Sequence, residues 1–209
     1  MSNKQLIYSK NSRMKNKDLI RDALVTVAQK IFARFGYDRT TMELIAQEAK
    51  RGKSTLYYYF KSKEDIFAAV IEREGNHIQK ELLKIINQNK SSRQLLKEYV
   101  LKRYKLIKQL VNYYNVVKED YLANLEIIEK YRKKHDEFEL LAIKQILIKG
   151  IMNDELSITH DQVDDIALAI AVAIKGLELP LFIENNITNF ETKIDLLLNV
   201  LFCGIAKNC

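Results

Sequence analysis

The sequence contains few of the residues that interrupt helices. It has one proline and six glycines among 209 residues, and beyond residue 63 no convincing run of alternating apolar residues indicates a β-strand. Hydrophobic residues make up 47% of the chain, which is enough to bury a substantial core in one or two domains. These features predict an all-α fold.

Long hydrophobic segments and cysteines are also scarce. The N-terminus has no apolar core of a secretory signal, and the most hydrophobic run, residues 166–183, is interrupted by Lys175 and Glu178. We therefore expect a soluble, cytoplasmic protein with no membrane partner. The two cysteines, Cys203 and Cys209, would lie about 9 Å apart in rise along one helix, too far for a mutual disulfide. We expect Cys203 to lie in the core.

Positive charge is concentrated at one end of the chain. Residues 1–63 hold 14 Lys and Arg against 5 Asp and Glu, a balance of +9, whereas residues 64–209 hold 20 against 22, a balance of −2. This asymmetry favours a polyanion partner, because each neutralised phosphate releases condensed counterions. The alternative is a solvated lysine-rich face. Residues 1–17 lack regular periodicity and are expected to form a mobile basic arm that can reach a minor groove.

Residues 18–63 are predicted to form three short helices around one small core. In the first helix, apolar residues recur at helical spacing from Ile20 to Phe35, and Gly36 provides a C-terminal stop. The second helix starts at a capping box of Thr40 and Glu43, which leaves Thr41 pointing outward. Its apolar residues share one face, and they are Met42, Ile45, Ala46 and Ala49.

The third helix is expected at about residues 53–59. The break before it falls at residues 50–52, where Gly52 tolerates the backbone angles that separate two helices. Leu56 and Phe60, four residues apart, face inward. The other side chains of this helix are mostly polar-tipped donors suited to phosphates and base edges.

These motifs resemble the tetracycline-repressor-like (TetR) family of bacterial transcriptional regulators. The resemblance covers about residues 18–70 and runs through Gly36-Tyr37, Thr40-Thr41, Ile45-Ala46, the block from Thr55 to Phe60, and Ser62-Lys63-Glu64. Lys50 and Arg51 depart from the pattern, because they replace the glycine and small apolar residue usual in the turn.

The resemblance implies a helix-turn-helix reader of double-stranded DNA. Backbone contacts are expected from Thr41, Tyr57, Tyr59 and Lys63, and contacts at or near base edges from Lys53, Ser54, Thr55 and Tyr58. Lys50 and Arg51 can add phosphate contacts. The family's mode of action implies a homodimeric repressor on a quasi-palindromic operator, released when an unknown small-molecule effector displaces the long helix that starts near Ser62. The alternative is a small-molecule-binding or interaction protein whose DNA binding is lost or non-specific.

Residues 64–209 are predicted to form a helical ligand-binding and dimerisation domain. Its centre is rich in aromatic residues that suit an amphipathic ligand or, alternatively, line an ordinary core, namely Tyr99, Tyr104, Tyr113, Tyr114, Tyr121 and Phe138. The last two helices are apolar on more than one side, which favours a two-fold four-helix contact between protomers over burial within one domain. The dimer candidates are Ile166, Ile170, Ile174, Leu177, Leu197, Leu201 and Ile205.

Two enzyme-like motifs are incomplete. The run from Gly52 to Thr55 resembles the end of a phosphate-binding loop, but Gln47 stands where that motif needs a glycine, and no strand precedes it. Glu74 and His77 match half of a di-iron carboxylate motif that would have to occur twice. We therefore expect no enzyme activity, no catalytic residue, no metal site and no cofactor.

Overall fold

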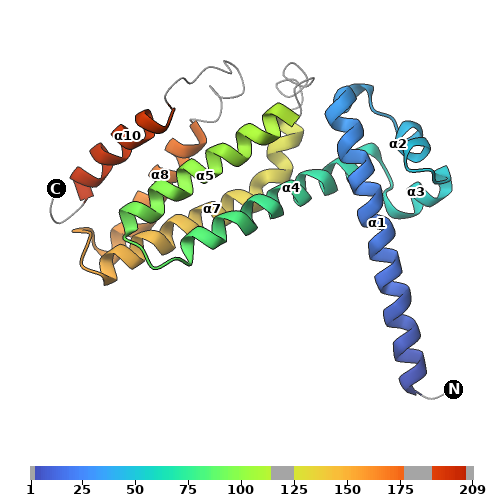
Figure 1. Ribbon diagram of the computed structural model, residues 1–209, viewed down its shortest axis with the longest axis horizontal. Helices are drawn as coiled ribbons and strands as arrows, with labels where there is room; N and C mark the ends of the chain where they lie inside the picture. The colour runs from blue at the N-terminus through green and yellow to red at the C-terminus, as the bar shows by residue number, and fades with distance from the viewer. Residues whose placement is uncertain (1–2, 114–124, 177–189, 206–209) are drawn as a thin grey trace. The chain divides into compact units, whose positions relative to one another are not determined.

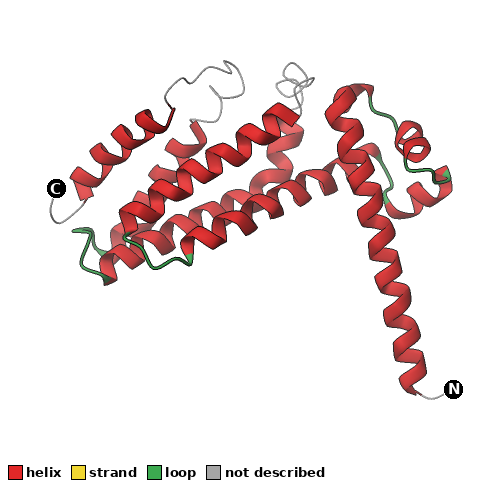
Figure 2. Ribbon diagram, viewed as in Figure 1, coloured by secondary structure: helices red, strands yellow, loops and turns green. Residues whose placement is uncertain are grey.

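The computed structural model describes residues 3–113, 125–176 and 190–205. For residues 3–15, 111–113, 125–129, 131, 132, 134 and 190 it describes the course of the backbone only. In this part of the chain, Figure 2 shows helices joined by loops and no strand, so the predicted all-α fold is confirmed. The helices, labelled in Figure 1, are α1 (Asn3–Arg39), α2 (Met42–Glu48), α3 (Lys53–Tyr59), α4 (Lys63–Ile86), α5 (Ser92–Tyr113), α7 (Leu125–Met152), η2 (His160–Gln162), α8 (Val163–Gly176) and α10 (Phe190–Ile205).

The chain divides into two compact units, and the division falls inside α4. The first unit includes Met1–Arg73, and the second includes Glu74–Tyr113 and the chain from Glu129 onward. The first unit therefore extends beyond residue 63, the boundary expected from the sequence. None of the described helices has the length and apolar character that crossing a membrane requires.

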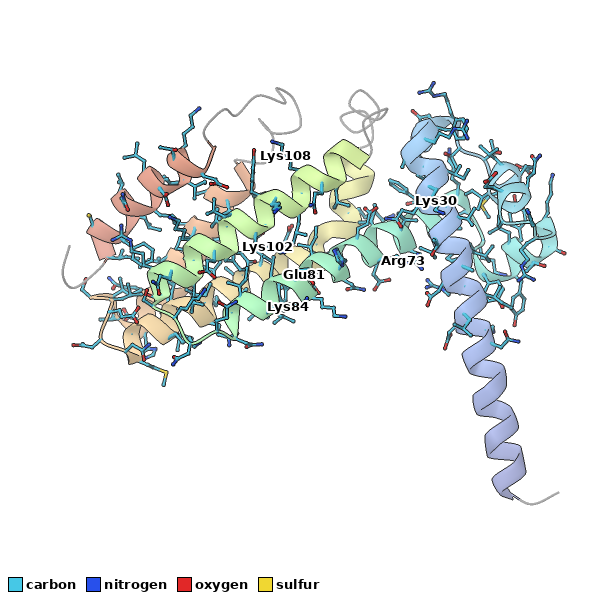
Figure 3. The ribbon with its side chains drawn as sticks, viewed as in Figure 1. Lys30, Arg73, Glu81, Lys84, Lys102 and Lys108 are labelled. Carbon is cyan, nitrogen blue, oxygen red and sulfur yellow. The ribbon has the colours of Figure 1, made fainter. Side chains whose placement is uncertain are left out.

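The core of the first unit is shared by α1, α2, α3 and the start of α4. Phe32 of α1 and Phe67 of α4 meet edge-on, with ring centroids 4.9 Å apart, and Tyr37 lies 4.8 Å from Phe67. Ile45 of α2 and Leu56 of α3 are fully buried. Arg73 of α4, labelled in Figure 3, donates hydrogen bonds to Thr26 Oγ1 and the Asp22 carbonyl of α1, so the contact between α4 and α1 continues to the end of the unit.

Helix α1 differs from the sequence-based expectation at its N-terminal end and agrees with it near its C-terminal end. It begins at Asn3, so the segment expected to be an irregular arm is helical. Near its other end Gly36 has φ 79° and ψ 173°, a conformation essentially restricted to glycine, and it interrupts the helix where the sequence predicted a stop.

The second unit packs its helices around one apolar core that includes Leu96 and Tyr99 of α5, Ile146 of α7, Ile170 of α8 and Phe202 of α10. Ion pairs tie neighbouring helices together at the rim. Lys97 of α5 lies 2.7 Å from Asp195 of α10, and Lys144 of α7 lies 2.7 Å from Asp164 of α8. Glu81 of α4 pairs with Lys84 and with Lys102 of α5 (Figure 3).

The expectation for Cys203 was wrong. Its side chain is exposed on α10 and is disulfide-bonded, while Cys209, the other cysteine of the chain, lies outside the described residues.

Candidate functional site

The motif of α2, turn and α3 is fixed at its start by Thr41. The Leu44 N–H donates to Thr41 Oγ1 at 3.2 Å, so Thr41 caps α2. Thr40, expected to be the cap, is instead buried and donates from its Oγ1 to the Gly36 carbonyl at 2.6 Å. Thr41 therefore takes the capping role that the sequence predicted for Thr40. Thr41 remains exposed, and its hydroxyl hydrogen is free of the cap bond, in which the oxygen acts as acceptor.

The turn between the helices depends on Lys50. Its φ is 51°, in the left-handed region, and its N–H donates to the Gln47 carbonyl while the Arg51 N–H donates to the Ala46 carbonyl, both at 3.0 Å. These two bonds form a Schellman ending for α2, in which glycine is the usual residue at the left-handed position. Gly52, which the sequence analysis assigned to the turn, has φ −64° and ψ 148°, ordinary extended backbone open to other residues. The break therefore falls at residues 50–52 as predicted, but the left-handed backbone angle is at Lys50 and not at Gly52.

Helix α3 has the bounds predicted from the sequence. Leu56 is fully buried and the C-cap residue Phe60 is nearly so, which anchors the short helix in the core of the first unit. Lys53, Ser54, Tyr57 and Tyr58 are exposed, whereas Thr55 and Tyr59 are half-buried. Lys53 Nζ lies 3.1 Å from Glu43 Oε1 of α2. This ion pair is solvent-exposed and therefore worth little, so the ammonium can leave Glu43 for a phosphate or a base edge.

Tyr58 links the exposed face of α3 to α1. Its side chain is 60% exposed, its ring meets Tyr59 edge-on with centroids 5.0 Å apart, and Lys17 Nζ of α1 lies 4.8 Å from the ring centroid. A hydrogen bond from Lys17 to the Tyr58 hydroxyl raises the pKa of the Lys17 ammonium. Lys17 and Tyr58 thus form one exposed cationic and aromatic surface, which the sequence did not predict because the two residues belong to different helices.

Lys63 has an internal role beside the one expected for it. Its ammonium donates to the Tyr37 carbonyl at 2.8 Å and to the Asp38 carbonyl at 3.4 Å, and it lies 4.3 Å from the centre of the Tyr37 ring. These bonds satisfy carbonyls at the end of α1, where a cation is favourable. Lys50 and Arg51 are exposed at the turn, in keeping with the phosphate contacts expected of them.

The predicted effector residues fall into two groups. Tyr99 is fully buried, and Tyr104 and Phe138 are half-buried against the same core. Tyr114 and Tyr121 lie outside the described residues, as does the side chain of Tyr113. Within the described part, the aromatic residues are thus at least partly core residues, which was the alternative considered above.

The sequence analysis did not predict the buried ion pair of Arg103 and Glu139 next to Tyr99. Arg103 Nη2 donates to Glu139 Oε2 at 3.0 Å, and Arg103 Nε lies 2.6 Å from Glu139 Oε1. The Tyr99 hydroxyl has no hydrogen-bond partner in the described structure. Burial, and then the charge of Glu139, raises the pKa of Tyr99 well above its usual range. The sequence offered one sign of this ion pair. Arg103 lies at helical spacing from Leu96, Tyr99 and Val100, so its charge falls on the side of the helix that faces the core.

Most of the predicted dimer residues pack inside their own protomer. Ile170 and Ile174 are buried in the core, and Ile166, Leu201 and Ile205 are partly buried against it. Leu197 is exposed, and Leu177 lies outside the described residues. The exposed apolar residues of these helices are instead Leu168 and Val172 on α8 and Leu196, Leu197 and Val200 on α10.

The geometry of the first unit agrees with comparisons to known proteins. The family model of bacterial regulatory proteins of the tetR family matches residues 24–70, which hold the motif and its scaffold. The helix-turn-helix unit of this chain is therefore that of the TetR family. The chain is 26% identical to the transcriptional regulator QacR of Staphylococcus aureus over 167 residues, covering 76% of this chain and 84% of QacR.

Solved structures extend the likeness of this chain beyond the motif. A transcriptional regulator of Cytophaga hutchinsonii is 27% identical with a TM-score of 0.67, covering 88% of this chain and 97% of that one. The complex of SmeT, from Stenotrophomonas maltophilia, with triclosan has a TM-score of 0.68 at 18% identity, covering 90% and 92% of the two chains. At that identity the likeness to SmeT concerns the fold. A helix-turn-helix DNA-binding domain followed by a helical domain is therefore the architecture of this chain.

Proposed function

We propose that this TetR-family protein is a homodimeric repressor that leaves a quasi-palindromic operator when a small molecule binds its C-terminal domain. The observation that carries the proposal is the exposed face of α3, where Lys53, Ser54 and Tyr58 project from a helix anchored by Leu56. Such a helix can enter a major groove with its polar side chains toward the base edges.

The residues of the motif divide into two groups by position. Lys53, Ser54 and Tyr58, with the half-buried Thr55, are proposed to contact bases or lie near them. The remaining proposed contacts go to the phosphate backbone and come from Thr41, Lys50, Arg51, Tyr57, Tyr59 and Lys63. Lys63 can serve DNA only in part, because its ammonium already binds the end of α1.

Selection of bound fragments from randomised DNA tests this function. An enriched inverted repeat is expected, with half-sites about one helical turn or a multiple apart. The variant Lys53→Gln should bind with altered sequence preference, whereas Lys80→Gln, an exposed lysine of the second unit, should behave as the wild type. Salt-sensitive binding without enrichment would instead support the alternative of a protein with non-specific DNA binding.

Dimerisation is proposed through the exposed faces of α8 and α10, shifted from the residues first expected. Leu168, Val172 and Gly176 follow one another at four-residue steps on α8, as do Leu196, Val200 and Gly204 on α10. A Cβ built at Gly176 or Gly204 would meet no described atom within 4 Å. The protomer's own packing therefore does not require glycine there, and close approach of a partner helix would explain it.

The dimer face can be tested with one matched pair of variants. Leu196→Glu with Val200→Glu introduces charge at side chains that are 66% and 67% exposed, so the monomer should fold, but the dimer should dissociate. Leu141→Glu on α7, at a side chain 64% exposed, is the control and should remain dimeric. Sedimentation velocity distinguishes the two. A dimer that tolerates both glutamates would place the interface elsewhere.

The effector is proposed to bind among α4, α5 and α7 and to act through α4, which runs from Lys63 in the first unit to Ile86 in the second. The ligand needs only to prefer the conformer that does not bind DNA, since a few kcal/mol of difference changes occupancy by orders of magnitude. SmeT, named as the repressor of a multidrug efflux pump and solved with triclosan, is an example with this fold. Native mass spectrometry of the purified protein should reveal a retained small molecule, and adding it should release the selected DNA.

A further inference from the structure

A carboxylate lies beside the first lysine of the recognition helix. Residues 41–63 contain five basic residues and two acidic ones, Glu43 and Glu48, both on α2. Glu43 Oε1 lies 3.1 Å from Lys53 Nζ, and this ion pair joins α2 to α3, which Figure 1 shows next to each other. A negative charge on a surface that approaches phosphates weakens binding to DNA, so its place next to a base-reading lysine calls for a reason.

The Glu43 carboxyl is ionised when the protein meets DNA near neutral pH. A hydrogen bond from its own backbone N–H, and then the Lys53 ammonium, lower the pKa of this carboxyl. The side chains are 64% exposed for Lys53 and 52% exposed for Glu43, so a duplex can reach the pair. An ammonium has three N–H donors, and the contact with Glu43 occupies one of them. Two donors therefore remain for a base edge.

We propose that Glu43 is a specificity-determining residue, which holds the Lys53 ammonium away from the phosphate backbone and leaves it available to base edges. The inference rests on the proposed DNA-binding function and deepens it. Lys53 is the first residue of α3, and the N-terminal residues of a recognition helix are those that contact base edges. On a matching sequence, guanine O6 and N7 can accept from Lys53 while Glu43 keeps its contact.

The charge of Glu43 opposes non-specific binding more than operator binding. On a sequence without the matching base, the Lys53 ammonium has to leave Glu43 to reach a phosphate. Once the negative charge is removed, the flexible lysine stem lets the ammonium neutralise a nearby phosphate on any sequence. Such a contact adds affinity and salt dependence but carries no sequence information. The specificity ratio, the Kd for a non-matching duplex divided by the Kd for the operator, should therefore fall.

The test removes one charge at a time from α2. Glu43→Gln keeps the size of the side chain, and Glu48→Gln is the matched control because Glu48 is exposed on the same helix and carries the same charge. Lys53→Gln, alone and combined with Glu43→Gln, completes a double-mutant cycle that shows whether Glu43 acts through Lys53. Each variant, verified as helical by circular dichroism, is titrated at several salt concentrations. The two DNA probes are the selected inverted repeat and a shuffled duplex of the same length and base composition.

Glu43→Gln should bind the shuffled duplex more tightly than the wild type does, and its binding to the repeat should change less. One new phosphate contact per protomer of a dimer steepens the slope of log K against log salt on the shuffled duplex by about 1.8. Lowering the salt concentration from about 200 to about 50 mM should then strengthen this binding about twelvefold more than in the wild type.

The control and the cycle have their own expected results. Glu48→Gln should keep the wild-type specificity ratio, because any effect of its charge acts on both duplexes alike. In the Lys53→Gln background, Glu43→Gln should leave the ratio unchanged, because the ammonium that it would release is gone.

Failure of the inference and failure of the proposed function give different results. An equal fall of the specificity ratio in Glu48→Gln, or a fall that persists without the Lys53 ammonium, would overturn the inference, because charge alone would explain it. An unchanged ratio in Glu43→Gln would overturn it as well. In these cases the wild type still selects the repeat, and the proposed function stands. If the wild type selects no repeat, sequence-specific DNA binding itself fails, and the role of Glu43 fails with it.

Discussion

Replacement of Lys50 by glycine should stabilise the protein, although it removes a side chain without creating a contact. Lys50 occupies the left-handed position of the Schellman ending of α2 with φ 51°. The left-handed backbone conformation destabilises the folded state by about 1–2 kcal/mol for a residue with a Cβ, but not for glycine. Glycine in turn makes the unfolded chain less ordered, which costs about 0.4–1 kcal/mol. The expected net gain for Lys50→Gly is therefore about 0.5–1 kcal/mol.

Urea unfolding followed by circular dichroism measures this gain, and two further variants test its cause. Lys50→Ala keeps the Cβ and removes the charge, so it should not reproduce the gain. Gly52→Ala should change the free energy of unfolding by less than about 0.5 kcal/mol, because Gly52 has ordinary backbone angles and its Cβ would meet only Ser54 Oγ at 3.7 Å. If alanine at position 50 stabilises as much as glycine, the charge and not the backbone is responsible, and the reasoning is refuted.

Two further predictions concern the buried polar groups of the second unit. Arg103→Met should cost about 3–5 kcal/mol in urea unfolding because it leaves Glu139 buried without its cation, and Arg103→Met with Glu139→Leu should recover most of that loss. Tyr99→Phe removes a buried, unpartnered hydroxyl and should raise stability at neutral pH by about 1 kcal/mol. Above about pH 10 the unfolded tyrosine ionises while folded Tyr99 stays neutral because its pKa is raised, so the wild type should lose about 1.4 kcal/mol per pH unit relative to the variant. A constant difference across that range would contradict the raised pKa.

Local patterns in the sequence were sufficient to predict the helices of the helix-turn-helix domain. Apolar spacing placed Met42, Ile45 and Leu56 in the core, and the bounds of α3 agree with those predicted. The spacing could not decide between Thr40 and Thr41 as the cap, because adjacent threonines offer the same hydroxyl one residue apart. Nor could it show that Lys50 takes the left-handed conformation, since glycine two residues later was the more favourable candidate.

The sequence by itself determined the helical class, the position of the recognition helix and the basic character of the N-terminal end, because these depend on composition and on spacing along one helix. Only the tertiary structure decided which apolar sides of α8 and α10 are covered, that Lys63 binds the end of α1, and that Lys17 lies beside Tyr58. A helix that is apolar on several sides carries no local mark of which side its own protomer covers. Contacts between residues far apart in the chain depend on how the helices pack, which short-range periodicity does not specify.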